Sequence, residues 1–351
     1  MQPPRSLCSL PPEGAPTASE RPDAVGMNRR NFFRSAGAAV AAGAATSTAS
    51  ARGNKTLPPD AVGLLFDSTL CVGCKACVPA CKEANDMPPE VSTQDALWDT
   101  PLDISGKTLN VIKVYKKGTP EVKDREENGF AFVKKSCLHC VDASCVSACP
   151  VKAMKKDEKT GVVSYDKNAC IGCRYCVAAC PFGVPRFTYD TPTPQISKCQ
   201  LCTHRWPDGK YAACAEVCPT GATLFGKVSD LKAEIARRKA LEPGKPTTYP
   251  RGRLGGPDQS YPGTAAKYVD HVYGEKELGG TQMLMLSGIA FDKLGYPTLP
   301  EQSFASQSET LQHTLYGGLV MPIAFLGGLT WLAKRNVKAE DDSAAGGHDG
   351  E

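Results

Sequence analysis

Sixteen of the seventeen cysteines fall into four groups of four, and this arrangement constrains the chain more than any other feature. Each group opens with two cysteines separated by two residues and ends with two separated by three. Groups two, three and four end in Cys-Pro, whereas Lys82 follows group one. In chain order the groups are Cys71, Cys74, Cys77 and Cys81; Cys137, Cys140, Cys145 and Cys149; Cys170, Cys173, Cys176 and Cys180; and Cys199, Cys202, Cys214 and Cys218.

This spacing predicts iron–sulfur ligation. Cysteines three apart in a tight loop can direct three thiolates to three corners of one cuboidal cluster, while the fourth lies in a diverging turn and serves the cluster of a partner group. Proline after the fourth cysteine fixes the local backbone where the chain leaves the cluster. Four such groups therefore predict four [4Fe–4S] clusters.

Disulfides, zinc and haem fit the cysteine pattern less well. Disulfides would have to form strained pairings within C-x-x-C runs. Structural zinc sites usually join two C-x-x-C knuckles, not three successive thiolates and an offset fourth. A c-type haem needs a histidine directly after C-x-x-C, and none is present. His139 and His204 lie near cysteines without ligand spacing, so we interpret them as structural.

Basic residues flank many of the cysteines, and the sequence leaves their role open. They could offset the negative charge of thiolate-ligated clusters, or they could belong to an ordinary solvated surface. The residues concerned are Lys75, Lys82, Lys134, Lys135, Lys152, Arg174, Arg186 and Lys198.

The region from 60 to 228 repeats a short apolar segment beside each cysteine group, which indicates duplicated units. Such runs, bounded by Gly and Asp, are typical of small hairpin strands. They are Gly63–Asp67, Gly129–Val133, Gly161–Asp166 and Gly221–Gly226. Residues 82–127 form an insertion with one further strand, Leu109–Tyr115. The fold class expected is small α+β and loop-rich.

After residue 228 the pattern changes. Residues 229–310 form an extension and linker, with a helix over Ser229–Leu241 capped by Ser229, a loop over Glu242–Pro262, a strand at Thr281–Leu286 and a linker at Tyr296–Gln307. Leu315–Ala333 carries no charge and is long enough to cross a bilayer as a helix of about 28 Å. Basic residues follow it, so residues 334–351 are expected to be a cytoplasmic tail, disordered after Ala339.

The N-terminus has the pattern of an export signal. Arg29-Arg30 is followed by an Ala/Gly-rich stretch and by Ala49-Ser50-Ala51, a spacing typical of signal-peptidase sites. We therefore expect a twin-arginine signal peptide at 27–51, preceded by an upstream extension at 1–26 that contains Cys8.

Neither nucleic-acid binding nor catalysis is indicated by the sequence. The net charge is only +4 and the basic residues do not form one run, so a nucleic-acid partner is not expected. The chain contains no convincing catalytic triad, phosphate loop or nicotinamide fingerprint. It is therefore expected to conduct electrons, not to catalyse bond chemistry.

The chain resembles the four-cluster iron–sulfur subunits of membrane-bound respiratory oxidoreductases, a family with a duplicated bacterial-ferredoxin fold. Within it, the chain is most similar to the iron–sulfur subunit of the hydrogenase-2 type of [NiFe] hydrogenase. The segments that carry the resemblance are Leu70–Cys74, Lys135–Asp142, Gly172–Cys176, Tyr273–Lys276, Gly279–Gln282 and Gln312–Tyr316.

This resemblance implies that groups one and four share two clusters and that groups two and three share the other two. The implied ligand sets are Cys71, Cys74, Cys77 with Cys218; Cys199, Cys202, Cys214 with Cys81; Cys137, Cys140, Cys145 with Cys180; and Cys170, Cys173, Cys176 with Cys149. Lys82, in place of proline, leaves these sets intact.

The resemblance also implies partners and a location. The partners are the large and small subunits of a [NiFe] hydrogenase and an integral membrane subunit that reacts with quinone. The folded, cluster-loaded protein would lie on the periplasmic face of the cytoplasmic membrane, held by one C-terminal transmembrane helix. The alternative is the corresponding subunit of a formate dehydrogenase or a related molybdenum enzyme.

Overall fold

The computed structural model describes residues 51–90, 100–257 and 259–345, with side chains described to Lys334. Its central sheet is built around β1 (Val62–Asp67), which pairs antiparallel with β9 (Thr223–Lys227) and parallel with β13 (Met283–Leu286). The short β11 (Gly252–Arg253) extends the sheet beyond β9. Side chains from β1 are buried on both faces of this sheet, as expected for a strand that reads as a continuous apolar run.

Four short helices recur at equivalent places in the cysteine groups: each begins at the third cysteine of its group or one residue before it. They are α2 (Cys77–Ala84), α3 (Ser144–Ser147), α4 (Tyr175–Ala178) and α5 (Ala213–Glu216). Helix α2 packs against α5, and α3 packs against α4. The duplication predicted from the sequence therefore takes the form of two helix pairs, although the helices themselves were not predicted.

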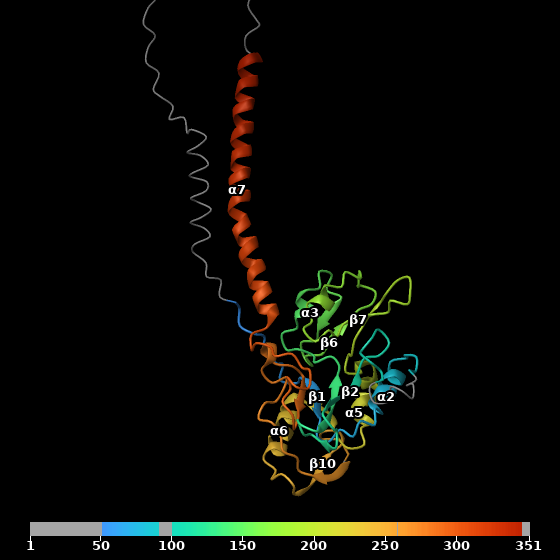
Figure 1. Ribbon diagram of the computed structural model, residues 1–351. Coiled ribbons are helices and arrows are strands. Elements are labelled where there is room, and N and C mark those ends of the chain that lie inside the picture. The colour runs from blue at the N-terminus through green and yellow to red at the C-terminus, as the bar shows by residue number, and fades with distance from the viewer. Residues whose placement is uncertain (1–50, 91–99, 258, 346–351) are drawn as a thin grey trace, which may run out of the picture. The chain divides into compact units, whose positions relative to one another are not determined.

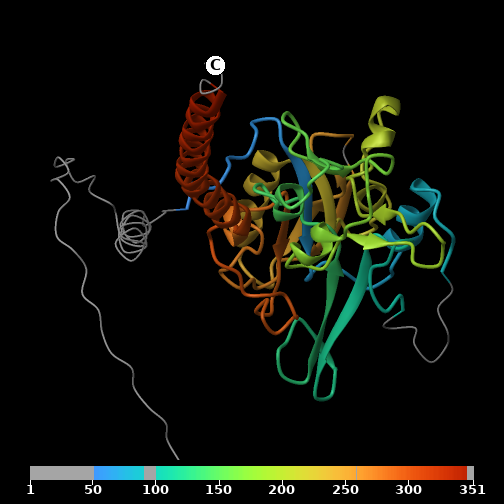
Figure 2. The ribbon, with the colours of Figure 1, turned by 90° about the horizontal axis from the view of Figure 1, so that it is seen from above.

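Small hairpins accompany these helices. β5 (Met154–Lys156) pairs with β6 (Val163–Tyr165), and β7 (Arg186–Phe187) pairs with β8 (Ile196–Ser197). The insertion contributes β2 (Val111–Lys117), which pairs along its length with β4 (Gly129–Lys135) beside the short β3 (Val122–Lys123). Figure 2 shows β2 and β4 as a long teal ribbon, and Figure 1 shows α3, β6 and β7 gathered in one part of the domain.

These elements confirm the predicted α+β, loop-rich fold class. The expected strands are present, and four of them, β2, β6, β9 and β13, begin two residues later than predicted. A 3-10 helix, η2 (Thr203–Asp208), fills the long gap inside group four, and a second, η3 (Glu277–Gly279), precedes β13.

Two predictions for the extension after residue 228 were wrong. Helix α6 (Val228–Lys239) begins one residue early, with Lys227 at the cap position, and the Ser229 hydroxyl bonds to Asp230 instead of capping the helix. The segment expected to be loop contains β10 (Pro246–Pro250), which pairs with β12 (Ser260–Thr264) in a register that places Tyr249 opposite Tyr261. A cross-strand aromatic pair stabilises a hairpin that its prolines would otherwise disfavour.

A buried ion pair fastens α6 to the central sheet. Arg238 donates to Asp67 at the end of β1 at 2.7 Å and to Glu234 on its own helix at 2.8 Å, and both Arg238 and Asp67 have fully buried side chains. Asp67 also accepts from the hydroxyls of Tyr268 and Thr69. Because Asp67 lies four residues before Cys71, this network ties the extension to the strand that leads into group one.

The last helix, α7 (Phe304–Ala345), is longer than expected at both ends. It begins inside the predicted linker and continues to Ala345, where disorder was predicted after Ala339. The stretch Phe304–Lys334 is long and apolar enough to cross a membrane, and none of its most apolar window is buried. The predicted extension (1–26) and nearly all of the predicted signal peptide (27–51) lie outside the described residues.

Arg52 joins three distant parts of the chain at the start of α7. Its guanidinium bonds Asp142 through two nitrogens at 2.7 and 3.0 Å and Glu309 at 2.7 Å. Ser303 donates to the same carboxylate of Asp142 at 2.6 Å. Asp142 is buried and lies in the four-residue loop between Cys140 and Cys145, so the first turns of α7 are bonded directly to group two.

Candidate metal centres

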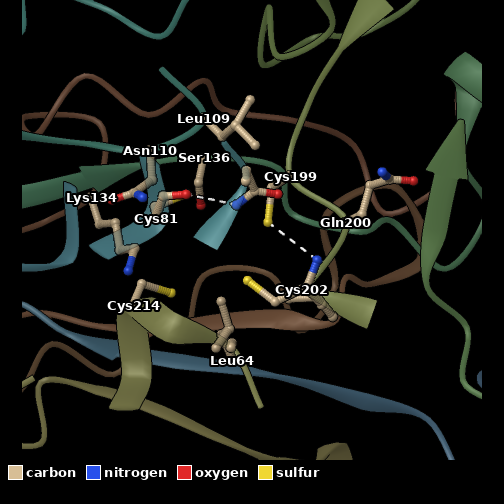
Figure 3. A pocket seen from close by; sticks show the side chains of 13 residues that line it. Leu64, Cys81, Leu109, Asn110, Lys134, Ser136, Cys199, Gln200, Cys202 and Cys214 are labelled. Atoms are coloured by element: carbon tan, nitrogen blue, oxygen red, sulfur yellow. Dashed lines mark hydrogen bonds between the residues drawn. The ribbon is translucent and has the colours of Figure 1, made fainter. Parts of the chain in front are cut away.

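The described cysteines gather into four sets, and each set contains three cysteines from one group and one from its partner group. Three sets line separate cavities. We name these three site A, site B and site D. Site A consists of Cys71, Cys74, Cys77 and Cys218. Site B consists of Cys81, Cys199, Cys202 and Cys214, and Figure 3 shows the thiols of the last three turned toward a common space. Site D consists of Cys149, Cys170, Cys173 and Cys176.

The remaining four cysteines form site C: Cys137, Cys140, Cys145 and Cys180. Burial, and then the nearby Cys145, Cys180 and Cys137, raise the pKa of Cys140 well above its ordinary value. Burial and Cys137 likewise raise the pKa of Cys180. Sites A to D thus bring together the same cysteines as the four sets that the resemblance implied, including the exchange of the fourth cysteine between partner groups, and their role as cluster ligands stays a prediction.

A left-handed turn precedes the second cysteine of every group. The residue at this position has a positive φ in all four, at Gly73 (67°), His139 (50°), Gly172 (71°) and Leu201 (52°). This conformation bends the backbone so that the first two thiols face one point. Glycine adopts it without strain, and it costs energy at His139 and Leu201.

Backbone N–H groups point at several of the sulfurs. Met154 donates to Cys149 and Thr223 donates to Cys218, each at 3.4 Å and each from five residues after its cysteine. Leu201 donates to Cys199 at 3.4 Å. Hydrogen bonds of this kind stabilise sulfur ligands that carry negative charge. Their repetition in groups two and four is a further sign of duplication.

The cysteines have the environment of ligands for a cofactor larger than one ion. Burial raises the pKa of Cys77, Cys81 and Cys145 to about 12. Such thiols are protonated at neutral pH, so iron, which binds thiolate, must displace their protons. All sixteen are free thiols in the structure. Within residues 51–90, 100–257 and 259–334, no three Cys, His, Asp or Glu side chains converge closely enough to hold a single ion. A cuboidal cluster, whose ligands are spread over its corners, fits these four-cysteine sets, whereas zinc does not.

The four sites are neighbours in the order A, B, C, D. In each case burial raises the pKa of a thiol, and a cysteine of the neighbouring site raises it further. Cys214 of site B does so for Cys77 of site A. Cys137 of site C does so for Cys199 of site B, and Cys176 of site D for Cys145 of site C. At the two ends of this order lie the two exposed cysteines, Cys74 in site A and Cys173 in site D.

The structure divides the basic residues that flank the cysteines into buried and exposed ones, a distinction that the sequence could not make. Lys134 and Lys198 are fully buried and Lys82 nearly so, whereas Lys152 and Arg174 are exposed. Lys82, the residue in place of proline, donates to the carbonyls of Pro88 and Lys107, so it holds the insertion.

The two histidines have backbone partners, in agreement with a structural role. Nδ1 of His139 accepts from the N–H of Val163 at 3.1 Å, and burial keeps the pKa of His139 well below its ordinary value. His204 contacts the carbonyl of Ala84 through Nε2.

Comparisons with known proteins agree with this geometry. Residues 129–228 match the family model of the 4Fe–4S dicluster domain. The chain is 47% identical over 332 residues to the hydrogenase-2 operon protein HybA of Escherichia coli O157:H7, an alignment that covers 93% of this chain and 100% of the relative. HybA of Shigella flexneri matches equally well.

Formate dehydrogenase subunits are also similar, over less of the chain. The iron–sulfur subunit of formate dehydrogenase-O from Escherichia coli K12 is 36% identical over 51% of this chain and 57% of the relative. The HybA alignments therefore cover far more of the chain than this one does. The chain belongs to the family of ferredoxin-type iron–sulfur electron-transfer subunits that includes HybA.

Proposed function

We propose that this protein relays single electrons through four [4Fe–4S] clusters, one in each of sites A to D, between the catalytic part of a [NiFe] hydrogenase and a quinone-reactive subunit in the membrane. The observation that carries the proposal is the order of the sites. Four thiol sets follow one another through the domain, and the exposed Cys74 and Cys173 lie at opposite ends of the series.

The chain's own residues position and insulate the clusters. Each cluster, when bound, accepts and donates one electron without making or breaking bonds in a substrate. Cys81, Cys149, Cys180 and Cys218 cross from one group to its partner and so fix neighbouring sites at a set spacing. Apolar side chains such as Leu64 and Leu201 close the inner cavities against water, while Cys74 and Cys173 leave the terminal sites open to a partner.

The chain is proposed to be a non-catalytic subunit. Its partners would be the large and small hydrogenase subunits, whose terminal cluster must approach one end of the series, and an integral membrane subunit at the other. The HybA relatives, aligned over their whole length, support this assignment. The formate dehydrogenase relatives support the alternative, a molybdenum enzyme, over 51% to 62% of the chain.

We further propose export by the twin-arginine route and anchoring by one transmembrane helix, Leu315–Ala333. The arginine pair within 27–51 supports export. The apolar, exposed α7 supports anchoring, and Lys334 and Arg335 after it support a cytoplasmic tail at 334–351. The soluble domain would then lie on the periplasmic face.

The test is a separation of two activities in the membrane complex. Cys74→Ser and Cys173→Ser alter the terminal sites without touching a hydrogenase active site. We expect both variants to lose hydrogen-dependent quinone reduction while hydrogen-dependent reduction of a dye that docks directly on the catalytic subunits persists. Nickel in the purified complex supports the hydrogenase partner. Full quinone reduction by both variants, or molybdenum without nickel, would overturn the proposal.

A further inference from the structure

Lys134 is a fully buried cation between two of the candidate centres. It lies near the end of β4 with 0% of its surface exposed. Its side chain lines the cavity of site B together with Cys81, Cys199, Cys202 and Cys214, and its ammonium donates to Thr223, which lines the cavity of site A. Figure 3 shows the side chain directed into the space beside Cys81 and Cys214. One ammonium group therefore faces sites A and B together.

Within the described part of the chain, no carboxylate forms an ion pair with this ammonium. Its polar contact there is the neutral hydroxyl of Thr223, at 3.2 Å. An unpaired buried ammonium costs several kcal/mol of desolvation free energy. The charge is tolerable if the groups in sites A and B are anionic.

Two more buried lysines, Lys82 and Lys198, are placed differently. Lys198 donates to the carbonyls of Val163 and Cys199. Lys82 donates to two carbonyls and pairs with Glu90 at 3.2 Å. The ammonium of each of these two lysines donates hydrogen bonds to backbone carbonyl oxygens and so stabilises a loop. By contrast, Lys134 lines the cavity of site B, and within the described residues its ammonium has no carbonyl partner.

We propose that Lys134 is the shared counter-charge of the clusters in sites A and B and holds the reduction potentials of both above the values they would have without it. An added electron makes a cluster more negative, so a fixed positive charge nearby stabilises the reduced form more than the oxidised form. Lys134 thereby favours entry of an electron into this half of the series. The inference rests on the proposed function, because it requires clusters in both sites.

The test is an anaerobic redox titration of the whole complex, followed by electron paramagnetic resonance. Lys134→Met removes the charge at similar length, and Lys134→Arg keeps it. Lys156→Met is the matched control, because Lys156 is a partly buried lysine whose ammonium donates to the carbonyl of Cys140 in site C. The paramagnetic resonance signal that changes in Cys74→Ser belongs to site A, and the one that changes in Cys202→Ser belongs to site B.

The inference predicts that Lys134→Met lowers the two identified potentials by at least about 59 mV, which is a tenfold change for a one-electron couple. Lys134→Arg should restore most of the loss, and Lys156→Met should leave both potentials in place. Unchanged potentials in Lys134→Met, with the iron content of the parent protein, would overturn the inference alone. A parent protein without clusters in sites A and B would instead overturn the proposed function.

If Lys134→Met fails to assemble, a second variant provides the test. Thr223→Asp keeps Lys134 and places a carboxylate beside its ammonium. The same two potentials should then fall by a similar amount. If they do not, Lys134 acts only as a structural residue and the inference is wrong.

Discussion

Removing the guanidinium of Arg238 should detach α6 from the central sheet. In Arg238→Met the carboxylate of Asp67 stays buried but loses the cation that lies 2.7 Å away in the parent protein. Breaking a buried pair by deleting one partner costs about 3–5 kcal/mol, since the remaining charge is left uncompensated. At about 1.4 kcal/mol per tenfold, the population in which α6 is open should rise by a factor on the order of 10² to 10³.

Arg237→Met is the matched control, because Arg237 lies on the same helix and pairs with the same Glu234 but has a side chain 40% exposed. Its loss should cost less than about 1 kcal/mol. The assay is amide hydrogen exchange with mass spectrometry on the detergent-solubilised, iron-loaded full chain, read over α6 and β1. If the two variants exchange within tenfold of one another, the ion pair does not hold α6 and the reasoning fails.

Three further predictions follow from single contacts. Gly63→Ala should cost about 1–3 kcal/mol, since an added Cβ would meet the carbonyl oxygen of Gln282 at 1.9 Å; a parent-like temperature for loss of visible absorbance would contradict this. Arg52→Met should speed exchange in the first turns of α7 by about tenfold or more, since Asp142 loses a two-nitrogen contact; unchanged exchange there would refute it. Burial alone would raise the pKa of Glu234, but its arginine partners hold that pKa below the ordinary value. Its stabilising effect is therefore present above about pH 4.3 and fades as the pH falls through the lowered value. Glu234→Gln should thus speed exchange of α6 at pH 7, and its difference from the parent protein should shrink steadily as the pH falls below about 4.3. A difference that stays constant over that range would count against it.

The cysteine pattern allowed more of the candidate site than of the fold to be predicted. Spacing and resemblance together named the four sets that the structure gathers, because ligand geometry dictates the sequence at those positions. The connecting helices α3 to α5 are four residues long, too short for any helical periodicity to be visible. The β10–β12 hairpin was missed because its prolines are typical of loops.

Two features of the site depend on tertiary structure and so had no local signal. Gly73 and Gly172 could have suggested a left-handed turn before the second cysteine, whereas His139 and Leu201 in the same place could not. Lys134 and Lys135 are adjacent on β4, yet only Lys134 is fully buried between two sites. The alternation of a strand would send them to opposite faces, but the sequence did not say which face the cysteines occupy.

The most direct test of the account is the iron and acid-labile sulfide content of the full chain, purified anaerobically from membranes with its partners, after subtraction of the partners' own metal. Four [4Fe–4S] clusters predict about sixteen iron and about sixteen sulfide atoms per chain. About half of that would mean that one pair of sites is empty and that the series A to D is not continuous. Zinc in place of iron, without sulfide, would contradict the account entirely.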